Sequence, residues 1–137
     1  MADATKVLVV DDEAGVRWAL EMILLRNGFC VASAGSGEEA LAWLGQQTCH
    51  VILMDAKLGD IEGVELARKI RKQALSAAPV ILVSGYFYKD DSTVQSSLMA
   101  GDIAAFVTKP FRHEEILKAI HSVLVTGAPA LPMAPAP

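Results

Sequence analysis

The chain has 137 residues, the length of a single domain that can bury a sizeable core without disulfide or metal staples. Hydrophobic residues make up 53% and charged residues 20%, which excludes a disordered or highly charged chain. Lys and Arg number 12 against 16 Asp and Glu, and the net charge of −4 argues against a basic nucleic-acid-binding module. Because only 6% of the residues are aromatic, we expect a mostly aliphatic core.

Cysteine usage and apolar run lengths bear on the compartment. Cys30 and Cys49 each lie in an apolar stretch, so we expect two buried thiols in a reducing environment. The first apolar run is too short for a signal peptide, and no run approaches the ~18 apolar residues of a membrane span. We therefore expect a cytoplasmic protein without membrane contact.

Apolar runs of strand length alternate along the chain with stretches of helical spacing. In chain order the first half contains a strand at 6–10, a helix through Val16, Leu20 and Leu24, a strand at 29–33, a helix from Ser36 to about Leu44, and a strand at 50–54. The second half contains a helix through Val64, Ala67 and Ile70, a strand at 79–83, a helix through Val94 and Leu98, a strand at 103–107, and a helix through Ile116, Ile120 and Val123.

Capping residues mark several of these boundaries. Gly28 fits the position after the first helix, and Ser36 with Glu39 fits a capping box. Strict alternation of strands and helices predicts an α/β fold, with a parallel sheet and helices on both faces.

Residues 126–137 hold four of the six prolines. We assign 1–125 to the domain and 126–137 to a Pro/Ala-rich disordered tail or truncated linker.

Charged and hydroxyl side chains follow four of the five predicted strands. They are Asp11, Asp12 and Glu13 after the first strand, Asp55 after the third, Ser84 after the fourth and Lys109 after the fifth. Because ligands bind outside the carboxyl ends of a doubly wound sheet, we expect these side chains to meet. The second strand is followed only by Ala34 and Gly35, as expected of an outer strand away from the site.

A cluster of three carboxylates needs a cation, because otherwise one carboxylate would take up a proton. Oxygen ligands favour Mg²⁺, which requires only one or two carboxylates plus a phosphate. One carboxylate could attack phosphorus and form an aspartyl phosphate, while a lysine and a hydroxyl bind the phosphoryl oxygens. The alternative is that the acidic residues only cap helices. That alternative explains Glu13 well and explains Lys109 poorly, because Lys-Pro caps no helix N-terminus.

Four stretches of the chain combine into one longer motif. They are VLVVDDE with Asp11 and Asp12, VILMD ending in Asp55, ILVSG with Ser84, and AAFVTKPF with Phe106 and Lys109. The combination resembles the receiver domains of bacterial two-component response regulators over about residues 5–125, and it is highly specific. The resemblance implies a flavodoxin-like, doubly wound, five-stranded parallel sheet in the order 2-1-3-4-5 with five helices.

The resemblance also implies a phosphoacceptor and a metal site. Asp55 would accept the phosphoryl group. Asp12 would bind Mg²⁺ directly, Asp11 directly or through water, and the backbone carbonyl of Lys57 would be the third protein ligand. Mn²⁺ could substitute for Mg²⁺.

The remaining motif residues are implied to bind the phosphoryl group and to relay its arrival. Ser84 would hydrogen-bond it, Lys109 would pair with it, and Phe106 would turn inward when Ser84 moves. The implied function is a phosphorylation-dependent switch that catalyses only its own phosphorylation and dephosphorylation. Its partners would be a sensor histidine kinase or phosphotransfer protein and an output domain or effector on the helix 4–strand 5–helix 5 face. A homodimer formed on phosphorylation and a transcriptional output are compatible with this class.

Several positions depart from the family pattern. Leu58 and Gly59 stand where many receivers have Met-Pro, and Ser84 replaces the commoner Thr while keeping the hydroxyl. Lys57 and Tyr86 lie two residues after Asp55 and Ser84, where their side chains could overhang the site and obstruct the attacking water. We expect slow self-dephosphorylation, which Lys57→Asn with Tyr86→Ala should accelerate. The alternative is that both side chains point to solvent.

Two other classes compete with this interpretation. A haloacid-dehalogenase-type phosphatase also uses an Asp nucleophile after a strand, but it needs a second Asp two residues later, where this chain has Lys57. A pseudo-receiver would be an interaction module that is never phosphorylated. The complete acidic set, Ser84 and Lys109 argue against that second class.

Overall fold

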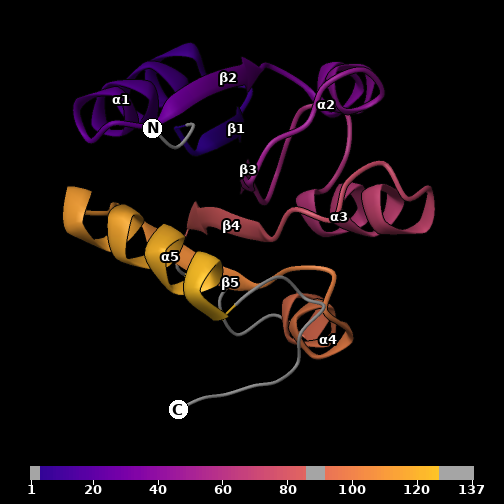
Figure 1. Ribbon diagram of the computed structural model, residues 1–137. Helices are drawn as coiled ribbons and strands as arrows, with labels where there is room; N and C mark the ends of the chain where they lie inside the picture. Colours follow the sequence, from indigo (N-terminus) through magenta and orange to yellow (C-terminus); the bar gives the residue numbers. More distant parts are fainter. Residues whose placement is uncertain (1–3, 86–91, 127–137) are drawn as a thin grey trace.

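The computed structural model describes residues 4–85 and 92–126, and within them five strands alternate with five helices (Figure 1). The strands are β1 (Lys6–Val10), β2 (Cys30–Ala34), β3 (Val51–Asp55), β4 (Val80–Gly85) and β5 (Ala105–Lys109). The helices are α1 (Ala14–Arg26), α2 (Gly37–Leu44), α3 (Gly63–Lys72), α4 (Ser92–Ala100) and α5 (His113–Thr126). The predicted α/β alternation is confirmed.

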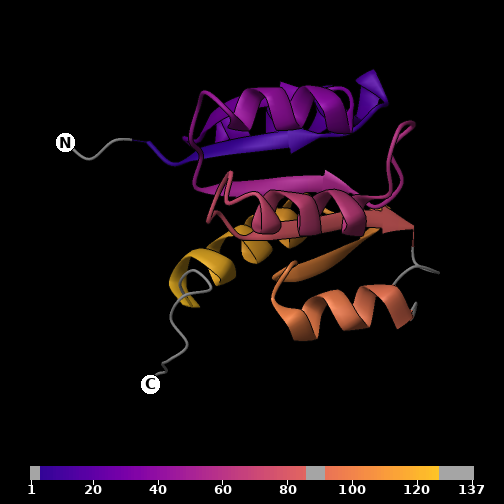
Figure 2. The same cartoon turned by 90° about the vertical axis from the view of Figure 1, so that its right-hand side faces the viewer.

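All five strands belong to one parallel sheet in the order β2-β1-β3-β4-β5, which confirms the doubly wound topology (Figure 2). The order reverses beside β1, since the chain first builds outward to β2 and then returns to β3 on the other side. Parallel pairing brings the carboxyl ends of the strands to one edge. Polar residues that end neighbouring strands therefore lie side by side.

Two aliphatic layers hold helices against the sheet. The helices α1 and α5 cover one face, and α2, α3 and α4 cover the other (Figure 1). Side chains of β1 alternate between these layers, with Val7 and Val9 in the α1–α5 layer and Leu8 and Val10 in the other. All four are at most 1% exposed, so from Val7 to Val10 this inner strand is apolar at successive rather than alternate positions.

Local signals account for the ends of several helices. Gly28 has φ of 86°, which confirms the left-handed stop predicted after α1. The Ser36 hydroxyl accepts a hydrogen bond from the Glu39 backbone N–H at 3.0 Å, so the predicted cap of α2 is present. The Glu39 carboxylate in turn accepts from the backbone N–H of Gly35 at 2.6 Å, one residue before the cap.

Two expectations about strands and thiols were wrong. Four of the predicted strands are displaced toward the C-terminus by one or two residues, and in β3, β4 and β5 the backbone pairing continues through the polar residues at their ends. Cys30 is exposed because β2 is the outer strand, so only Cys49 is partly buried. Burial raises the pKa of the Cys49 thiol to about 11, although the nearby Lys6 charge opposes this shift.

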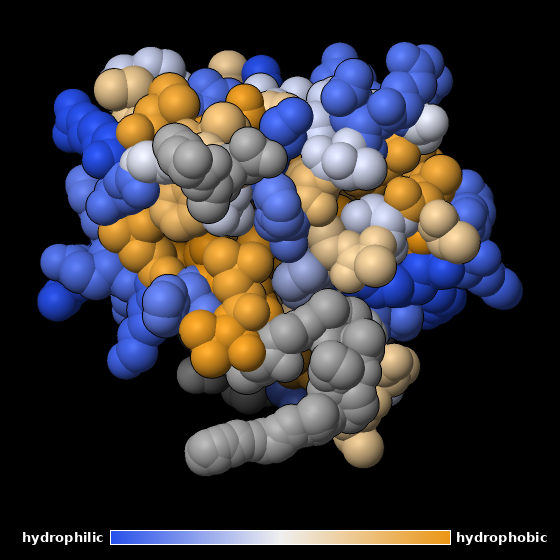
Figure 3. Space-filling view, viewed as in Figure 1, coloured by the Kyte–Doolittle hydropathy of each residue, from blue (hydrophilic) through white to orange (hydrophobic). Residues whose placement is uncertain are grey.

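Apolar side chains also reach the surface away from the carboxyl edge. Figure 3 shows such residues gathered where α5 ends, and Leu124 and Val125 are exposed there. Helix α5 ends at Thr126, and the rest of the predicted tail lies outside the described residues. Among the helices of residues 4–85 and 92–126, none combines the length and hydropathy that a bilayer crossing requires.

Candidate functional site

The predicted site residues converge at the carboxyl edge of the four strands β1, β3, β4 and β5. Asp55 is the last residue of β3, Lys109 is the last residue of β5, and Ser84 lies one residue from the end of β4. Asp11 and Asp12 follow β1 directly. Strand β2 lies outside this group at the edge of the sheet, as its lack of a functional side chain predicted.

Three carboxylates form the centre of the site. One oxygen each from Asp11, Asp12 and Asp55 lies within 4.8 Å of the others. Asp11 is 1% exposed and Asp55 is 8% exposed, whereas Asp12 is open to solvent. Hard, anionic oxygen donors with one open side suit Mg²⁺ or Mn²⁺, which keep several waters and need few protein ligands. The donor set therefore fits the implied divalent cation.

Lys109 supplies the positive charge within the cluster. Its Nζ lies 3.3 Å from Asp11 Oδ2 and 3.6 Å from Asp55 Oδ1. One ammonium cannot neutralise three carboxylates, so the cluster keeps a net negative charge. Burial, and then the Asp11 carboxylate, raise the pKa of Asp55, while Lys109 and the backbone N–H of Lys57 act in the opposite direction.

Asp11 is fixed by the start of α1. Its Oδ1 accepts from the backbone N–H of Glu13 at 2.9 Å, and its carbonyl oxygen accepts from Arg17 Nη1 at 2.7 Å. Glu13 precedes α1 but makes no side-chain capping hydrogen bond. The helix-capping alternative is therefore wrong for Glu13, while Asp11 does hold the turn with one oxygen and faces Lys109 with the other.

The loop from β3 to α3 closes tightly beneath Asp55. Gly63 donates its N–H to the carbonyl of Ala56 at 2.7 Å, and a Cβ at Gly63 would collide with the carbonyl oxygen of Asp55. Lys57 and Glu62 form an isolated antiparallel β-bridge through their backbones across the loop, and the Lys57 side chain is exposed. The tip of the loop lies beside the metal-site carboxylates, since a Cβ at Gly59 would stand 3.5 Å from Asp12 Oδ2.

The switch residues predicted from the sequence lie on neighbouring strands. Ser84 is 5% exposed and pairs with Thr108 of β5. Phe106 is partly buried and packs against the layer that contains α4. Tyr86 lies outside the described residues, so its predicted effect on phosphoryl lifetime stays a prediction.

Sequence analysis missed Asp60. Its carboxylate accepts hydrogen bonds from the backbone N–H groups of Gly37 and Glu38, each at 3.0 Å, at the start of α2. The partners lie 23 and 22 residues away, so no local motif could reveal this contact. An Asp in the loop after Asp55 was the only available signal.

The family model described as response regulator receiver domain matches residues 7–121. The chain therefore belongs to the receiver domains of response regulators, which act in two-component signalling. Receiver domains generally act as signalling switches rather than as catalysts.

Individual relatives agree with this assignment. Sensory transduction protein RegX3 of Mycolicibacterium smegmatis is 33% identical over 124 residues, which cover 90% of this chain and 52% of RegX3. The chain thus spans about half the length of this curated relative. Chemotaxis protein CheY4 of Vibrio cholerae superposes with a TM-score of 0.80 at 26% identity, covering 88% of this chain and 99% of CheY4. Response regulator TrrA of Thermotoga maritima, determined in complex with Mg²⁺–BeF, gives 0.75 at 28% identity, with 86% and 97% covered.

Proposed function

We propose that this domain is a phosphorylation-dependent switch whose phosphoacceptor is Asp55. The observation that carries the proposal is the cluster of three carboxylates within 4.8 Å, two of them contacted by Lys109. Such a cluster is costly unless a cation binds there, because like charges repel in a partly buried site.

Asp55 would react as a nucleophile. One carboxylate oxygen forms a bond to phosphorus while the P–N bond of a phosphohistidine breaks, and the imidazole leaves with the bonding electrons and takes up a proton. Lys109 stays beside the acceptor and offers its charge to the phosphoryl oxygens. Ser84, at the next strand end, supplies a hydroxyl donor.

Asp11, Asp12 and the backbone carbonyl of Lys57 would hold Mg²⁺, with Mn²⁺ as a substitute. When bound, the cation offsets charge that accumulates on the transferring phosphoryl group. The structure of TrrA in complex with Mg²⁺–BeF supports Mg²⁺ as a ligand of a domain with this fold. Gly59 leaves the approach to Asp12 free of a side chain, which keeps this carboxylate accessible.

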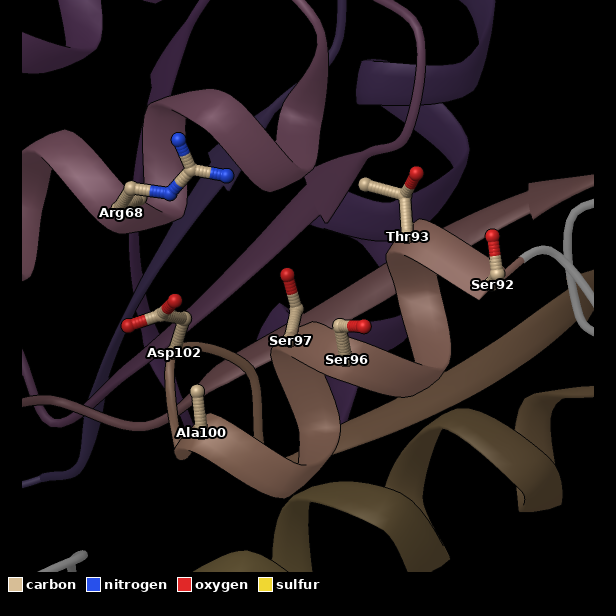
Figure 4. Close-up of a pocket in the computed structure, with 7 residues that line it drawn as sticks. All are labelled: Arg68, Ser92, Thr93, Ser96, Ser97, Ala100 and Asp102. Carbon is tan, nitrogen blue, oxygen red and sulfur yellow. The ribbon is translucent and has the colours of Figure 1, made fainter.

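Phosphorylation would be relayed through β4, β5 and α4. Ser84 is drawn toward the phosphoryl group, and Phe106 fills the space released beside the α4 layer. Val94 is the main apolar side chain that α4 buries. A polar hollow of about 380 Å³ lies between α3 and α4, lined in part by Arg68, Ser97 and Asp102 (Figure 4). Helix α4 therefore has room to shift against α3.

The α4–β5–α5 face would carry the signal to an output domain or effector, and a sensor histidine kinase or phosphotransfer protein would supply the phosphoryl group. A homodimer formed on phosphorylation would use the same kind of face. A transcriptional output is one form that this relay would take. The domain itself would act as a switch, with only intrinsic self-phosphorylation and self-dephosphorylation.

The test is the intact mass of the protein after incubation with acetyl phosphate and Mg²⁺. We expect a gain of one phosphoryl group, ~80 Da for an aspartyl phosphate, that is lost in Asp55→Asn and in EDTA. Glu65→Gln is the matched control, because Glu65 is an exposed carboxylate on α3 outside the cluster, and it should keep the gain.

Other outcomes favour the competing classes. A folded protein that gains no mass and binds no Mg²⁺ would be a pseudo-receiver. Sustained hydrolysis of a phosphomonoester would indicate a phosphatase of the haloacid-dehalogenase type, despite Lys57 two residues after Asp55. The decay rate of the phosphorylated form, compared with Lys57→Asn, measures the proposed effect on lifetime.

A further inference from the structure

Besides its approach to the carboxylate cluster, the β3–α3 loop makes a second contact, with the start of α2. At the loop tip, Gly59 lies beside Asp12 of the acidic cluster, and the next residue, Asp60, reaches the start of α2. Asp60 Oδ1 accepts from the Gly37 N–H and Oδ2 from the Glu38 N–H, both at 3.0 Å. The loop tip therefore spans the distance between a candidate metal ligand and a helix end.

Apolar packing repeats the same contact. A Cβ at Gly37 would collide with Cγ2 of Ile61, so the loop lies directly against the first turn of α2. Ile61 in turn packs on the core layer between the sheet and α2 and α3. The loop and α2 are therefore in close contact at Gly37 as well as at Asp60.

The loop is also closed on itself. The Leu58 N–H donates to the Ile61 carbonyl at 3.2 Å, and the backbones of Lys57 and Glu62 form an antiparallel β-bridge. A closed loop moves as one unit, so a contact at its tip also restrains the backbone of Lys57. The amides of Gly37 first, and of Glu38, hold the pKa of Asp60 below its usual value, which agrees with a carboxylate that stays ionised in this contact.

We infer that Asp60 is a positioning residue, which fixes the β3–α3 loop against α2 and so sets the backbone carbonyl of Lys57 and the neighbourhood of Asp12 for the divalent cation. The first part of this inference, that Asp60 fixes the loop against α2 (the loop half), stands on the contacts of Asp60 alone. The second part, that it thereby prepares the site for the divalent cation (the metal half), rests on the proposed function. In this inference the Gly35–Ala40 segment, which carries no reacting group, positions the β3–α3 loop.

The first experiment is calorimetric titration of the full chain with Mg²⁺. For Asp60→Ala we expect the Mg²⁺ dissociation constant to rise roughly three- to tenfold, at or below the effect of removing the outer partner of a metal ligand. Asp60→Asn keeps one acceptor oxygen, so its Mg²⁺ dissociation constant should lie between those of the wild type and of Asp60→Ala. If Asp60→Ala does not fold, Asp60→Asn serves in its place.

Two controls separate positioning from simpler causes. Glu38→Gln removes one charge from the same helix end and keeps the contact with the loop, which the Glu38 backbone N–H makes with Asp60. Ser36→Ala removes the other side-chain cap of α2, the hydrogen bond to the Glu39 N–H, and leaves the loop contacts in place. Both controls should change the Mg²⁺ dissociation constant less than Asp60→Ala does. An equal effect of Glu38→Gln would overturn the metal half.

The second experiment is amide hydrogen exchange in metal-free protein. The Leu58 amide should exchange faster in Asp60→Ala and at the wild-type rate in Ser36→Ala, because only the first variant releases the loop. Unchanged Leu58 exchange in Asp60→Ala would overturn the loop half. If the wild-type protein binds no Mg²⁺, the proposed function and the metal half both fail, and Leu58 exchange still decides whether Asp60 fixes the loop.

Discussion

Asp55 combines burial with two neighbouring carboxylates, so its ionised form is unfavourable in the folded protein. Burial and Asp11 raise its pKa above the ordinary value of 3.8, and Lys109 at 3.6 Å compensates only in part. A group with a raised pKa costs no stability at low pH, where it is protonated in both states. The cost develops as pH rises through 3.8 and is complete above the raised pKa. Unphosphorylated protein without metal therefore carries a charge penalty at neutral pH.

We expect Asp55→Asn to increase the free energy of unfolding at pH 7 in EDTA by on the order of 1 kcal/mol, the usual size of single-site effects. The gain should vanish as pH falls below the ordinary carboxyl value, because the wild-type carboxylate is then neutral too. Urea unfolding of both proteins across the acidic and neutral range measures this difference. Equal stabilities at pH 7 would show that Lys109 and the Lys57 N–H compensate the penalty completely.

The convergence of the site residues was the easiest part of the site to predict. Asp55 and Lys109 end their strands and Ser84 lies one residue before the end of β4, so the topology of the parallel sheet alone brings them together. Asp60 could not be found in this way, because its partners are backbone amides of another helix. A side chain that binds backbone atoms far along the chain leaves no pattern in the spacing of residue types.

At the scale of elements, the start of α3 depends on a residue without a side chain. A Cβ at Gly63 would collide with the Asp55 carbonyl and come within 2.9 Å of the Ala56 Cα. Both obstacles are backbone atoms, which cannot turn aside as a flexible side chain would. The acceptor strand and the third helix are therefore fitted to each other at this one position.

We expect Gly63→Ala to destabilise the protein by about 1–3 kcal/mol, the usual range for overpacking. Gly15→Ala is the matched control, because Gly15 lies in α1 with no atom within 4 Å of the added Cβ. It should stabilise the protein by about 0.5–1 kcal/mol, since alanine favours a helix over glycine. Thermal unfolding of the two variants tests the pair. A neutral Gly63→Ala would mean that α3 moves away from β3 without cost.

Element identity followed from the sequence better than element limits. Ser36 and Gly28 gave correct helix ends because each acts through its own local backbone. The strands extend further than their apolar runs, since the pairing of Asp55 with Val83 and of Ser84 with Thr108 continues the ladder. Exposure of Cys30 depends on which strand is outermost, a property of the whole sheet that a local apolar run does not encode.

At the scale of the whole molecule, the helices of the two core layers differ in how much apolar contact holds them to the sheet. The layer with α1 and α5 is joined to the sheet by long aliphatic rows such as Leu20, Leu24, Ile116 and Ile120. In the other layer α4 buries Val94 as its main apolar contact and borders a polar hollow. Strand β5 carries both Phe106 and Lys109 and is an outer strand of the sheet. We therefore expect a change at Lys109 to be transmitted most readily into β5 and α4.

We expect phosphorylation to change amide hydrogen exchange in Ser92–Ala100 and Ala105–Lys109 and to leave Ala14–Arg26 nearly unchanged. The physical reason is that α4 has few apolar contacts to lose, whereas displacement of α1 would expose a fully packed row. The measurement compares the protein with and without acetyl phosphate and Mg²⁺, and Asp55→Asn under the same conditions separates the effect of the phosphoryl group from that of the metal. A response that is strongest in α1, or equal in Asp55→Asn, would contradict a relay through α4 and β5. In that case the carboxylate cluster would communicate with the rest of the molecule through the β1–α1 turn, where the Asp11 carbonyl already accepts from Arg17.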